Sequence, residues 1–286
     1  MSSDTTHYVT GTPAPAAGNP SFRSEPRPKL QHRLSADQIR QYHEDGFTVI
    51  RGLLDSGEAE FYRAEANVVV EAVRGLSETY RLDPMKNLRV ELDPETDRVW
   101  KVDPFTDMSA VFGALARDRR ICDRLAGLYD GHEPRLFKDK LILKPPHSHG
   151  NNLHQDHNWW QGFPESCLTV TIALDRSTRV NGCTRLWAVP DRRFLHKAGS
   201  LSGQIPESAI AELPVTYLEL EPGDAAIFHC LTPHAAEPNN TDHTRCVLFL
   251  SYSDSRDGEW RQAHYDHFFW YRTAAMEATR DEHYFL

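Results

Sequence analysis

The pattern of hydrophobic and polar positions changes its period once along the chain, near Gly131. Before this point, apolar residues recur in three stretches, at about residues 35–45, 57–73 and 110–128. Their spacing of three and four residues is that of one face of an α-helix. After it, short apolar runs alternate with Pro, Gly and Asn, which is typical of β-strands joined by turns. Helices followed by many short strands predict an α+β fold.

The first predicted helix carries signals at both of its ends. Ser35 and Gln38 have the spacing of a capping box, and Gly46 is suited to end the helix. The run at 47–50 then predicts a strand. A further short strand is expected at 99–102, inside an otherwise polar segment.

Five strands are predicted in the second half of the chain, at residues 136–144, 167–174, 215–220, 225–229 and 245–252. Such a series predicts an antiparallel barrel or sandwich core. We expect one domain over residues 34–286 and a flexible tail over residues 1–33, which are rich in Pro, Ser, Thr and Ala. The aromatic stretch beyond Gly258 is expected to form a helix that packs over the barrel.

Charge and cysteine usage narrow the choice of partners and location. The net charge is −9 without any basic block, so neither nucleic acid nor a membrane is an expected partner. No apolar signal segment or membrane-spanning run is present. The five cysteines lack Cys-x-x-Cys spacing, which predicts reduced thiols and a cytoplasmic location.

Candidate chemistry is concentrated in the segment His154-Gln155-Asp156. In an extended segment, residues two apart point to the same face. A second His on a neighbouring strand would complete the two-His-one-carboxylate set of non-haem Fe(II) oxygenases. In a chain with 15 His residues such a pair also arises by chance, so the pair alone is weak support.

Further motifs follow in order, namely Asn181-Gly182, Pro190, Gly223-Asp224, Phe228-His229, His234, Pro238-Asn239 and Arg245. Together with His154-Gln155-Asp156, this ordered set resembles the phytanoyl-CoA dioxygenase (PhyH-like) family of Fe(II)- and 2-oxoglutarate-dependent oxygenases. The resemblance extends over about residues 35–255. It implies a double-stranded β-helix core, a cupin-like jelly roll, with flanking N-terminal helices.

The resemblance also implies roles for particular residues. His154, Asp156 and His234 match the iron ligands of the family, and Arg245 matches the residue that binds the distal carboxylate of 2-oxoglutarate. A guanidinium suits that role because it makes two parallel hydrogen bonds to a carboxylate. The implied cofactors are Fe(II), 2-oxoglutarate and O2, with ascorbate as a stimulant, and the implied products include succinate and CO2.

The chain departs from the family pattern at Ala236, where members often place a Ser or Thr that helps to hold the cosubstrate. A hydroxyl from Thr169 or Thr171 is the candidate replacement. Lysines also alternate along the strand before the His-x-Asp pair, so that three of them share one face with Ile142, at positions Lys138, Lys140 and Lys144. We expect Lys138 or Lys140 to contact the cosubstrate, and the alternative is that this face is solvated.

Other residues near the motif have simpler interpretations. Six further histidines are expected to be structural rather than metal ligands: His147, His149, His157, His229, His264 and His267. Trp159 and Trp160 follow the ligand pair directly, and at least one of them is expected to line a substrate pocket. Because Asp156 is retained where halogenating relatives carry a small residue, hydroxylation or another C–H oxidation is expected.

Two functions from different classes remain at this point. The first is a dioxygenase that hydroxylates or otherwise oxidises a C–H bond of a small molecule, such as a specialised metabolite or an acyl derivative, as a monomer or homodimer. The second is a non-oxidative cupin-type metal-binding isomerase or binding protein. Arg245 favours the first, because a simple cupin has no need of a dicarboxylate anchor.

Overall fold

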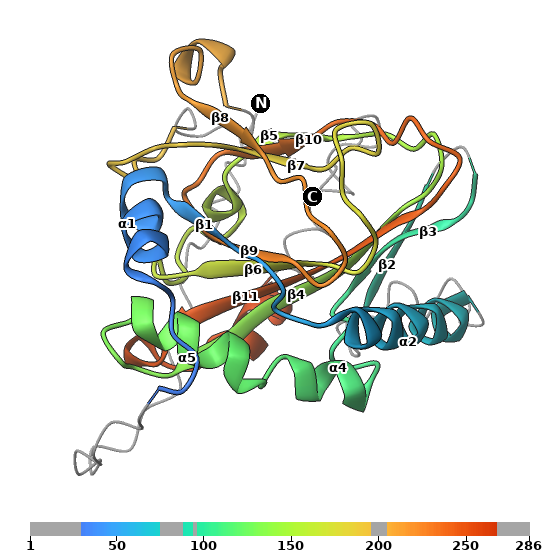
Figure 1. The fold of residues 1–286 in the computed structure, drawn as a ribbon, viewed down its shortest axis with the longest axis horizontal. Helices are drawn as coiled ribbons and strands as arrows, with labels where there is room; N and C mark the ends of the chain where they lie inside the picture. The colour runs from blue at the N-terminus through green and yellow to red at the C-terminus, as the bar shows by residue number, and fades with distance from the viewer. Residues whose placement is uncertain (1–29, 75–87, 94–95, 196–204, 268–286) are drawn as a thin grey trace, which may run out of the picture.

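The computed structural model describes residues 30–74, 88–93, 96–195 and 205–267 of the 286. Within these residues, a major and a minor antiparallel sheet lie across from one another (Figure 1). The major sheet has the strand order β1-β9-β6-β11-β4-β3-β2, and the minor sheet has the order β5-β10-β7-β8. This is the predicted α+β jelly-roll architecture.

The labelled α-helices are α1 (Ala36–Asp45), α2 (Ser56–Arg74), α4 (Ala110–Leu115) and α5 (Arg119–Leu128). The strands of the major sheet are β1 (Phe47–Ile50), β2 (Arg89–Leu92), β3 (Val99–Asp103), β4 (Pro134–Lys144), β6 (Leu168–Ala173), β9 (Ala225–His229) and β11 (Arg245–Asp254). Those of the minor sheet are β5 (Asn151–His154), β7 (Thr184–Trp187), β8 (Val215–Tyr217) and β10 (His234–Ala236).

Most predicted elements are present within a few residues of their expected bounds, and the departures have local causes. The helical stretch 110–128 is divided into α4 and α5 because Asp118 caps the second helix, its Oδ1 accepting from the Arg120 amide at 2.7 Å. Strands β2, β5, β7 and β10 were not among the predicted strands, and the strand expected at 215–220 ends at Tyr217. These strands have only three or four residues, too few to display an alternation.

The ends of the predicted domain are partly outside the described residues. Residues 1–29 and 268–286 lie there, and with them most of the predicted tail and part of the aromatic C-terminal stretch. Residues 261–267 are helical, as expected. At the end of the tail predicted over residues 1–33, the amides of Gln31 and His32 donate to Asp123 Oδ2 at 2.7 and 3.1 Å.

Helix α1 has both of its predicted ends. Ser35 and Gln38 form the reciprocal capping box, and Gly46 ends the helix with a φ of 82°. A Cβ at Gly46 would lie 2.8 Å from Thr232 Oγ1, so this turn requires glycine for its conformation and for its close approach. The turn delivers the chain into β1, at the edge of the major sheet.

The outer face of the major sheet is covered by helices (Figure 1). The cluster between them is apolar and includes Val69, Val73, Phe112, Leu125, Leu141 and Leu250. Burial of each such side chain contributes about 1.5–3 kcal/mol. The helices therefore hold the sheet rigid from outside and leave its opposite face for the interior of the barrel.

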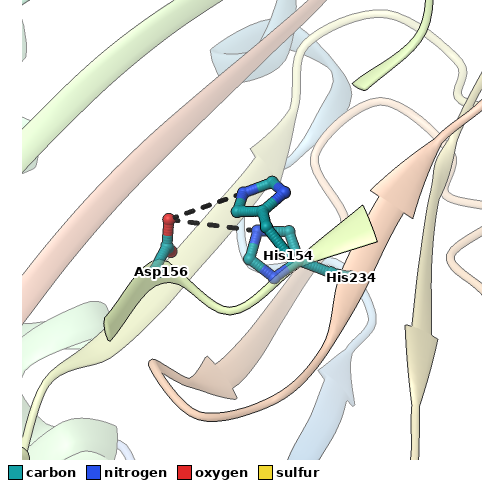
Figure 2. A group of neighbouring side chains, drawn as sticks. All are labelled: His154, Asp156 and His234. Carbon is teal, nitrogen blue, oxygen red and sulfur yellow. Dashed lines mark ion pairs between the residues drawn. The ribbon is translucent and has the colours of Figure 1, made fainter. Parts of the chain in front are cut away.

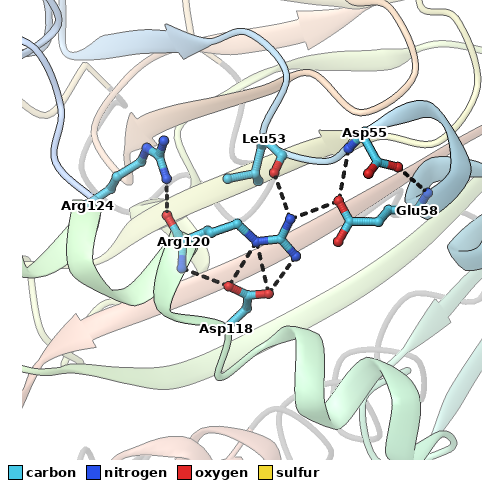
Figure 3. A network of polar contacts seen from close by, with 6 residues as sticks. All are labelled: Leu53, Asp55, Glu58, Asp118, Arg120 and Arg124. Carbon is cyan, nitrogen blue, oxygen red and sulfur yellow. Dashed lines mark hydrogen bonds and ion pairs between the residues drawn. The ribbon is translucent and has the colours of Figure 1, made fainter. Parts of the chain in front are cut away.

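Arg120 fixes α5 against the start of α2 (Figure 3). Its guanidinium binds both oxygens of Asp118, donates to the Leu53 carbonyl at 3.3 Å and contacts Glu58 Oε2 at 2.8 Å. Glu58 in turn accepts from the Asp55 amide as part of a capping box. One partly buried arginine thus joins two helix starts that are distant in sequence.

Candidate active site

Three side chains that could hold a metal converge between the two sheets (Figure 2). His154 at the end of β5 is the direct cross-strand partner of His234 at the start of β10. Asp156 Oδ1 lies 3.9 Å from His154 Nε2 and 4.0 Å from His234 Nε2. One ligand atom from each residue falls within 4.8 Å of the others. Two imidazoles and one carboxylate fit a first-row divalent metal such as Fe(II).

The backbone explains why His154 and Asp156 point to one place. Strand β5 ends at His154, but Gln155 keeps an extended conformation, with φ −111° and ψ 131°. The side chains on either side of Gln155 therefore share a face, as predicted. A 3-10 helix, Asp156–Trp159, begins immediately afterwards, so the strand does not continue and His157 turns toward Glu165, at 3.7 Å.

Backbone carbonyls orient both imidazole rings. The Nδ1 of His154 lies 2.6 Å from the Asn152 carbonyl, and the Nδ1 of His234 lies 3.0 Å from the Thr232 carbonyl. A proton on each Nδ1 makes these hydrogen bonds and leaves Nε2 as the free acceptor that faces Asp156. This second layer of contacts is typical of metal-binding histidines.

Electrostatics keep the three groups in their ligand forms at neutral pH. Burial, with His234 nearby, lowers the pKa of His154 to about 3, and burial likewise lowers the pKa of His234. Burial raises the pKa of Asp156, but Lys140 and the two histidines outweigh it and bring that pKa to about 2. Neutral imidazoles and an ionised carboxylate are the forms that bind metal.

Two buried cations lie side by side at one end of the barrel interior. Arg245 and Lys144 are cross-strand partners in β11 and β4, and both are almost fully buried. Arg245 donates to Ser177 Oγ at 3.4 Å, and Lys144 donates to the carbonyls of Gly182 and Glu237. In the part of the chain that the structure describes, no carboxylate lies at ion-pair distance from either cation.

The buried pair Arg245 and Lys144 is suited to bind an anion. Burial, followed by the neighbouring Arg245, lowers the pKa of Lys144 to about 7, and burial lowers the pKa of Arg245 to about 10. The Nε of Arg245 is buried without a hydrogen-bond partner among the described residues. Buried charges are costly unless they are paired, so a carboxylate entering here would gain two partners.

Gly182 is packed against this pair and offers a direct test. Its φ is 71°, and a Cβ there would overlap the Glu237 carbonyl and lie 2.6 Å from Lys144 Nζ. We expect Gly182→Ala to destabilise the fold by about 1–3 kcal/mol, from overpacking and a strained backbone, and to weaken 2-oxoglutarate binding. Thermal unfolding and calorimetric titration measure the two effects.

Gly127→Ala is the matched control for this variant. Gly127 lies in helix α5, and a Cβ there would meet nothing within 4 Å, so the substitution should leave stability equal or slightly higher. Unchanged stability and cosubstrate affinity in Gly182→Ala would show that the loop at Gly182 does not position Lys144.

The lysines of β4 face the barrel interior, and the solvated alternative is wrong. Lys138 is 4% exposed, and its Nζ lies 2.8 Å from Asp103 Oδ2. The Nζ of Lys140 lies 3.6 Å from Asp156 Oδ1, next to the candidate metal ligands. Only Lys144, which the predicted site did not include, lies beside Arg245.

The structure places the two threonines on the same interior face. Thr171 is buried opposite Phe249, the residue that is also the partner of Lys140. Thr169 shares a 2.8 Å hydrogen bond with Ser251. A cosubstrate contact from Thr171 stays a prediction.

Trp160 lies in the core. It is 2% exposed, with its ring 5.1 Å from that of Phe137 and 6.3 Å from that of His264. Trp159 is half-buried at the edge of the same apolar cluster. Truncation of Trp160 would cost about 3–5 kcal/mol of stability, so Trp159 is the better residue for testing a substrate contact.

The other histidines lie apart from the metal candidates. His229 Nδ1 accepts from the Leu231 amide at 3.1 Å, His147 pairs with Asp242, and His149 stacks on Trp100. Among the described residues, the group at His154, Asp156 and His234 is the one set that is spaced to hold a metal.

No helix in the described residues has the length and apolar character needed to cross a membrane. The five cysteines are all free, as expected from their spacing.

Comparisons with known proteins identify the family of this chain. The family model for phytanoyl-CoA dioxygenase (PhyH) matches residues 42–247. Methylphosphonate hydroxylase of Gimesia maris is 33% identical over 81% of this chain and 85% of its own. The 2-aminoethylphosphonate dioxygenase of an uncultured bacterium is 24% identical over 80% of this chain and 85% of its own.

Solved structures show the same fold. EctD from S. alaskensis with bound Fe has a TM-score of 0.68 at 20% identity and covers 81% of this chain and 82% of its own. A second EctD structure contains 2-oxoglutarate and 5-hydroxyectoine. The family match covers well over half of the sequence. The chain therefore belongs to the phytanoyl-CoA dioxygenase (PhyH) family of 2-oxoglutarate-dependent non-haem iron dioxygenases.

Proposed function

We propose that this protein binds Fe(II) through His154, Asp156 and His234, holds the distal carboxylate of 2-oxoglutarate on Arg245 and Lys144, and oxidises a C–H bond of a small molecule. The observation that carries the proposal is the buried pair Arg245 and Lys144, which has no carboxylate partner among the described residues. The pair lies on the same interior wall as Lys140, which contacts Asp156.

The separation of the two sites suits a dicarboxylate. Lys144 and Lys140 are four residues apart on β4, or about 13 Å between their Cα atoms. A five-carbon diacid and the long side chain of Arg245 together cover this distance. One carboxylate would then meet Arg245 and Lys144, while the 2-oxo acid end would reach the metal ligands.

Each group has a physical role in this scheme. The iron, when bound, lets O2 react with 2-oxoglutarate to give succinate, CO2 and an oxidant for the substrate. The carbonyls of Asn152 and Thr232 hold the two imidazoles in the required tautomer. The bidentate geometry of Arg245 fixes the direction in which the cosubstrate enters.

Retention of Asp156 supports hydroxylation as the outcome, since no ligand position is vacated for a halide. Phosphonates are the first small molecules to assay, because two relatives are named for acting on them. Specialised metabolites and acyl derivatives are the wider class. Action as a monomer or homodimer, without nucleic acid or membrane, stays part of the proposal.

Formation of succinate without a prime substrate tests the proposal. With Fe(II), ascorbate and O2, the purified protein should convert 2-oxoglutarate slowly to succinate and CO2, and exclusion of iron with a chelator should stop this. Some turnover is expected because 2-oxoglutarate and O2 both bind without the prime substrate. Mass spectrometry with ¹³C-labelled 2-oxoglutarate measures it.

The non-oxidative cupin alternative predicts a different result. A metal-binding isomerase or binding protein would retain the metal and leave 2-oxoglutarate unchanged under the same conditions. Absence of succinate from a metal-loaded protein, with a family hydroxylase as positive control, would favour that alternative.

A further inference from the structure

Lys140 has an unusual position for a buried lysine. It projects from β4 into the barrel, and its side chain is 15% exposed. Its ammonium makes no hydrogen bond within the described residues, and its one carboxylate neighbour there is Asp156, at 3.6 Å. The ring of Phe249 lies 5.8 Å away. A cation therefore stands beside the metal ligands, and the one carboxylate at ion-pair distance from it among the described residues, Asp156, is itself a candidate ligand.

The side of Lys140 that faces away from Arg245 is also basic. From Lys144, the interior positions of β4 run through Ile142 and Lys140 to Lys138, so Lys138 lies beyond Lys140. On the next two strands, Lys101 lies opposite Ile142 and Arg89 lies opposite Asp103. Lys101 and Arg89 are buried and ion-paired with Glu91, and Asp103 binds Lys138. The interior wall beside Lys140 therefore carries three further cations together with two carboxylates.

The charges around the metal ligands do not sum to zero when iron and 2-oxoglutarate are bound. This count rests on the proposed function. A divalent metal and Lys140 bring three positive charges, while Asp156 and the metal-bound carboxylate of 2-oxoglutarate bring two negative ones. One positive charge is left in a site of low dielectric, where its interaction with an anion is strong.

The geometry limits where that anion lies. The ammonium is 3.6 Å from Asp156 Oδ1, and a metal bonded to this oxygen would lie within about 6 Å of the ammonium, given a metal–oxygen bond of about 2.2 Å. A group that contacts Lys140 from the side of the metal could therefore bring its attached carbons close to the reacting centre.

We propose that Lys140 binds an anionic group of the prime substrate, a phosphonate, phosphate or carboxylate, and that this contact places the substrate's reacting carbon next to the metal. Lys138, Lys101 and Arg89, with their partners Asp103 and Glu91, line the adjoining part of the interior wall. Lys140 is then a substrate-binding residue rather than a contact for 2-oxoglutarate.

The test compares matched ligands and matched variants. The ligands are ethylphosphonate, propionate and the neutral isostere propionamide. The variants are Lys140→Met, which keeps the length of the side chain without its charge, Lys140→Arg, which keeps the charge, and Arg98→Met. Arg98 is an exposed cation in the turn before β3, so its loss controls for a general change in charge.

Calorimetry on protein loaded with Zn(II) and 2-oxoglutarate measures ligand binding without turnover. At least one of the two anions should bind the wild type tenfold or more tightly than propionamide, and the better of them identifies the anion class. Lys140→Met should lose tenfold or more of this affinity, Lys140→Arg should recover part of it, and Arg98→Met should match the wild type. Affinities for Zn(II) and for 2-oxoglutarate should stay within about threefold in Lys140→Arg and Arg98→Met, and in Lys140→Met the loss of anion affinity should exceed any loss of 2-oxoglutarate affinity.

Four outcomes would overturn this inference. In the wild type, propionamide would bind as tightly as the anions, or none of the three ligands would bind. In Lys140→Met, the anion affinity would be unchanged, or 2-oxoglutarate affinity would fall equally, which would make Lys140 a cosubstrate ligand. The proposed function is judged separately, by iron-dependent succinate formation in the wild type.

Discussion

Replacing His234 with alanine is expected to remove Fe(II) binding and to abolish 2-oxoglutarate turnover. His234 supplies one of three ligand atoms, and its partners His154 and Asp156 lie within 4.8 Å of it. The loss of affinity should be at least about a hundredfold, because even groups that only orient a ligand contribute 10–100-fold. Calorimetric titration with Fe(II) under anaerobic conditions, followed by the succinate assay, measures both effects. His154→Ala and Asp156→Ala should behave in the same way.

His229→Ala is the matched control for the metal prediction. His229 is buried and close in sequence, but its Nδ1 accepts from the Leu231 amide, and its ring is not among the candidate ligands. This variant should bind Fe(II) and retain measurable turnover, with some loss of stability from the missing hydrogen bond. If His229→Ala lost iron as completely as His234→Ala, the assignment of the distal ligand would be wrong.

Replacing Arg245 with alanine should raise the KM for 2-oxoglutarate strongly. Truncation of one partner of a buried charge pair costs about 2–5 kcal/mol, which corresponds to roughly 30-fold to several thousandfold in affinity. Arg245→Lys should recover only part, because an ammonium does not make the bidentate contact. Steady-state kinetics with varied 2-oxoglutarate give the KM, and equal values in both variants and the wild type would place the anchor elsewhere.

The pH dependence of the KM for 2-oxoglutarate separates the role of Lys144 from that of Arg245. Burial and Arg245 bring the pKa of Lys144 to about 7 in the free protein, so its ammonium loses its proton as pH rises through 7. A carboxylate binds better to the protonated form. The KM for 2-oxoglutarate should therefore rise between about pH 6.5 and 8.5 in the wild type, and this rise should flatten in Lys144→Met.

The candidate metal ligands could be predicted from the sequence, whereas the orientation of the lysines on β4 could not. The His-x-Asp pair and the later motifs were predictable because each is local and their order is specific. The alternation of Lys138, Lys140 and Lys144 fixed a shared face, but alternation alone does not say which face of a sheet is interior. That depends on the pairing of β4 with β11, which joins segments far apart in the chain.

The same limit explains why the sequence alone did not show that Trp160 is buried in the core or that Lys144 lies beside Arg245. Trp160 is close to Asp156 in sequence, but the 3-10 helix between them directs its ring into an apolar cluster. Lys144 lies ten residues before His154 in the chain, yet its cross-strand register sets it beside Arg245. Closeness in sequence therefore did not predict closeness in space where the backbone changes direction.

The pairing of His154 with His234 has a consequence for the integrity of the minor sheet. Strand β5 has four residues and lies at the edge of that sheet, where β10 is its one strand neighbour in the described residues. A metal bound by both histidines would cross-link β5 to β10 at this edge. At a free concentration one hundred times its dissociation constant, such a ligand adds about 2.7 kcal/mol to the folded state. Iron supply would then govern how often this edge frays, and with it the lifetime of the protein in the presence of proteases.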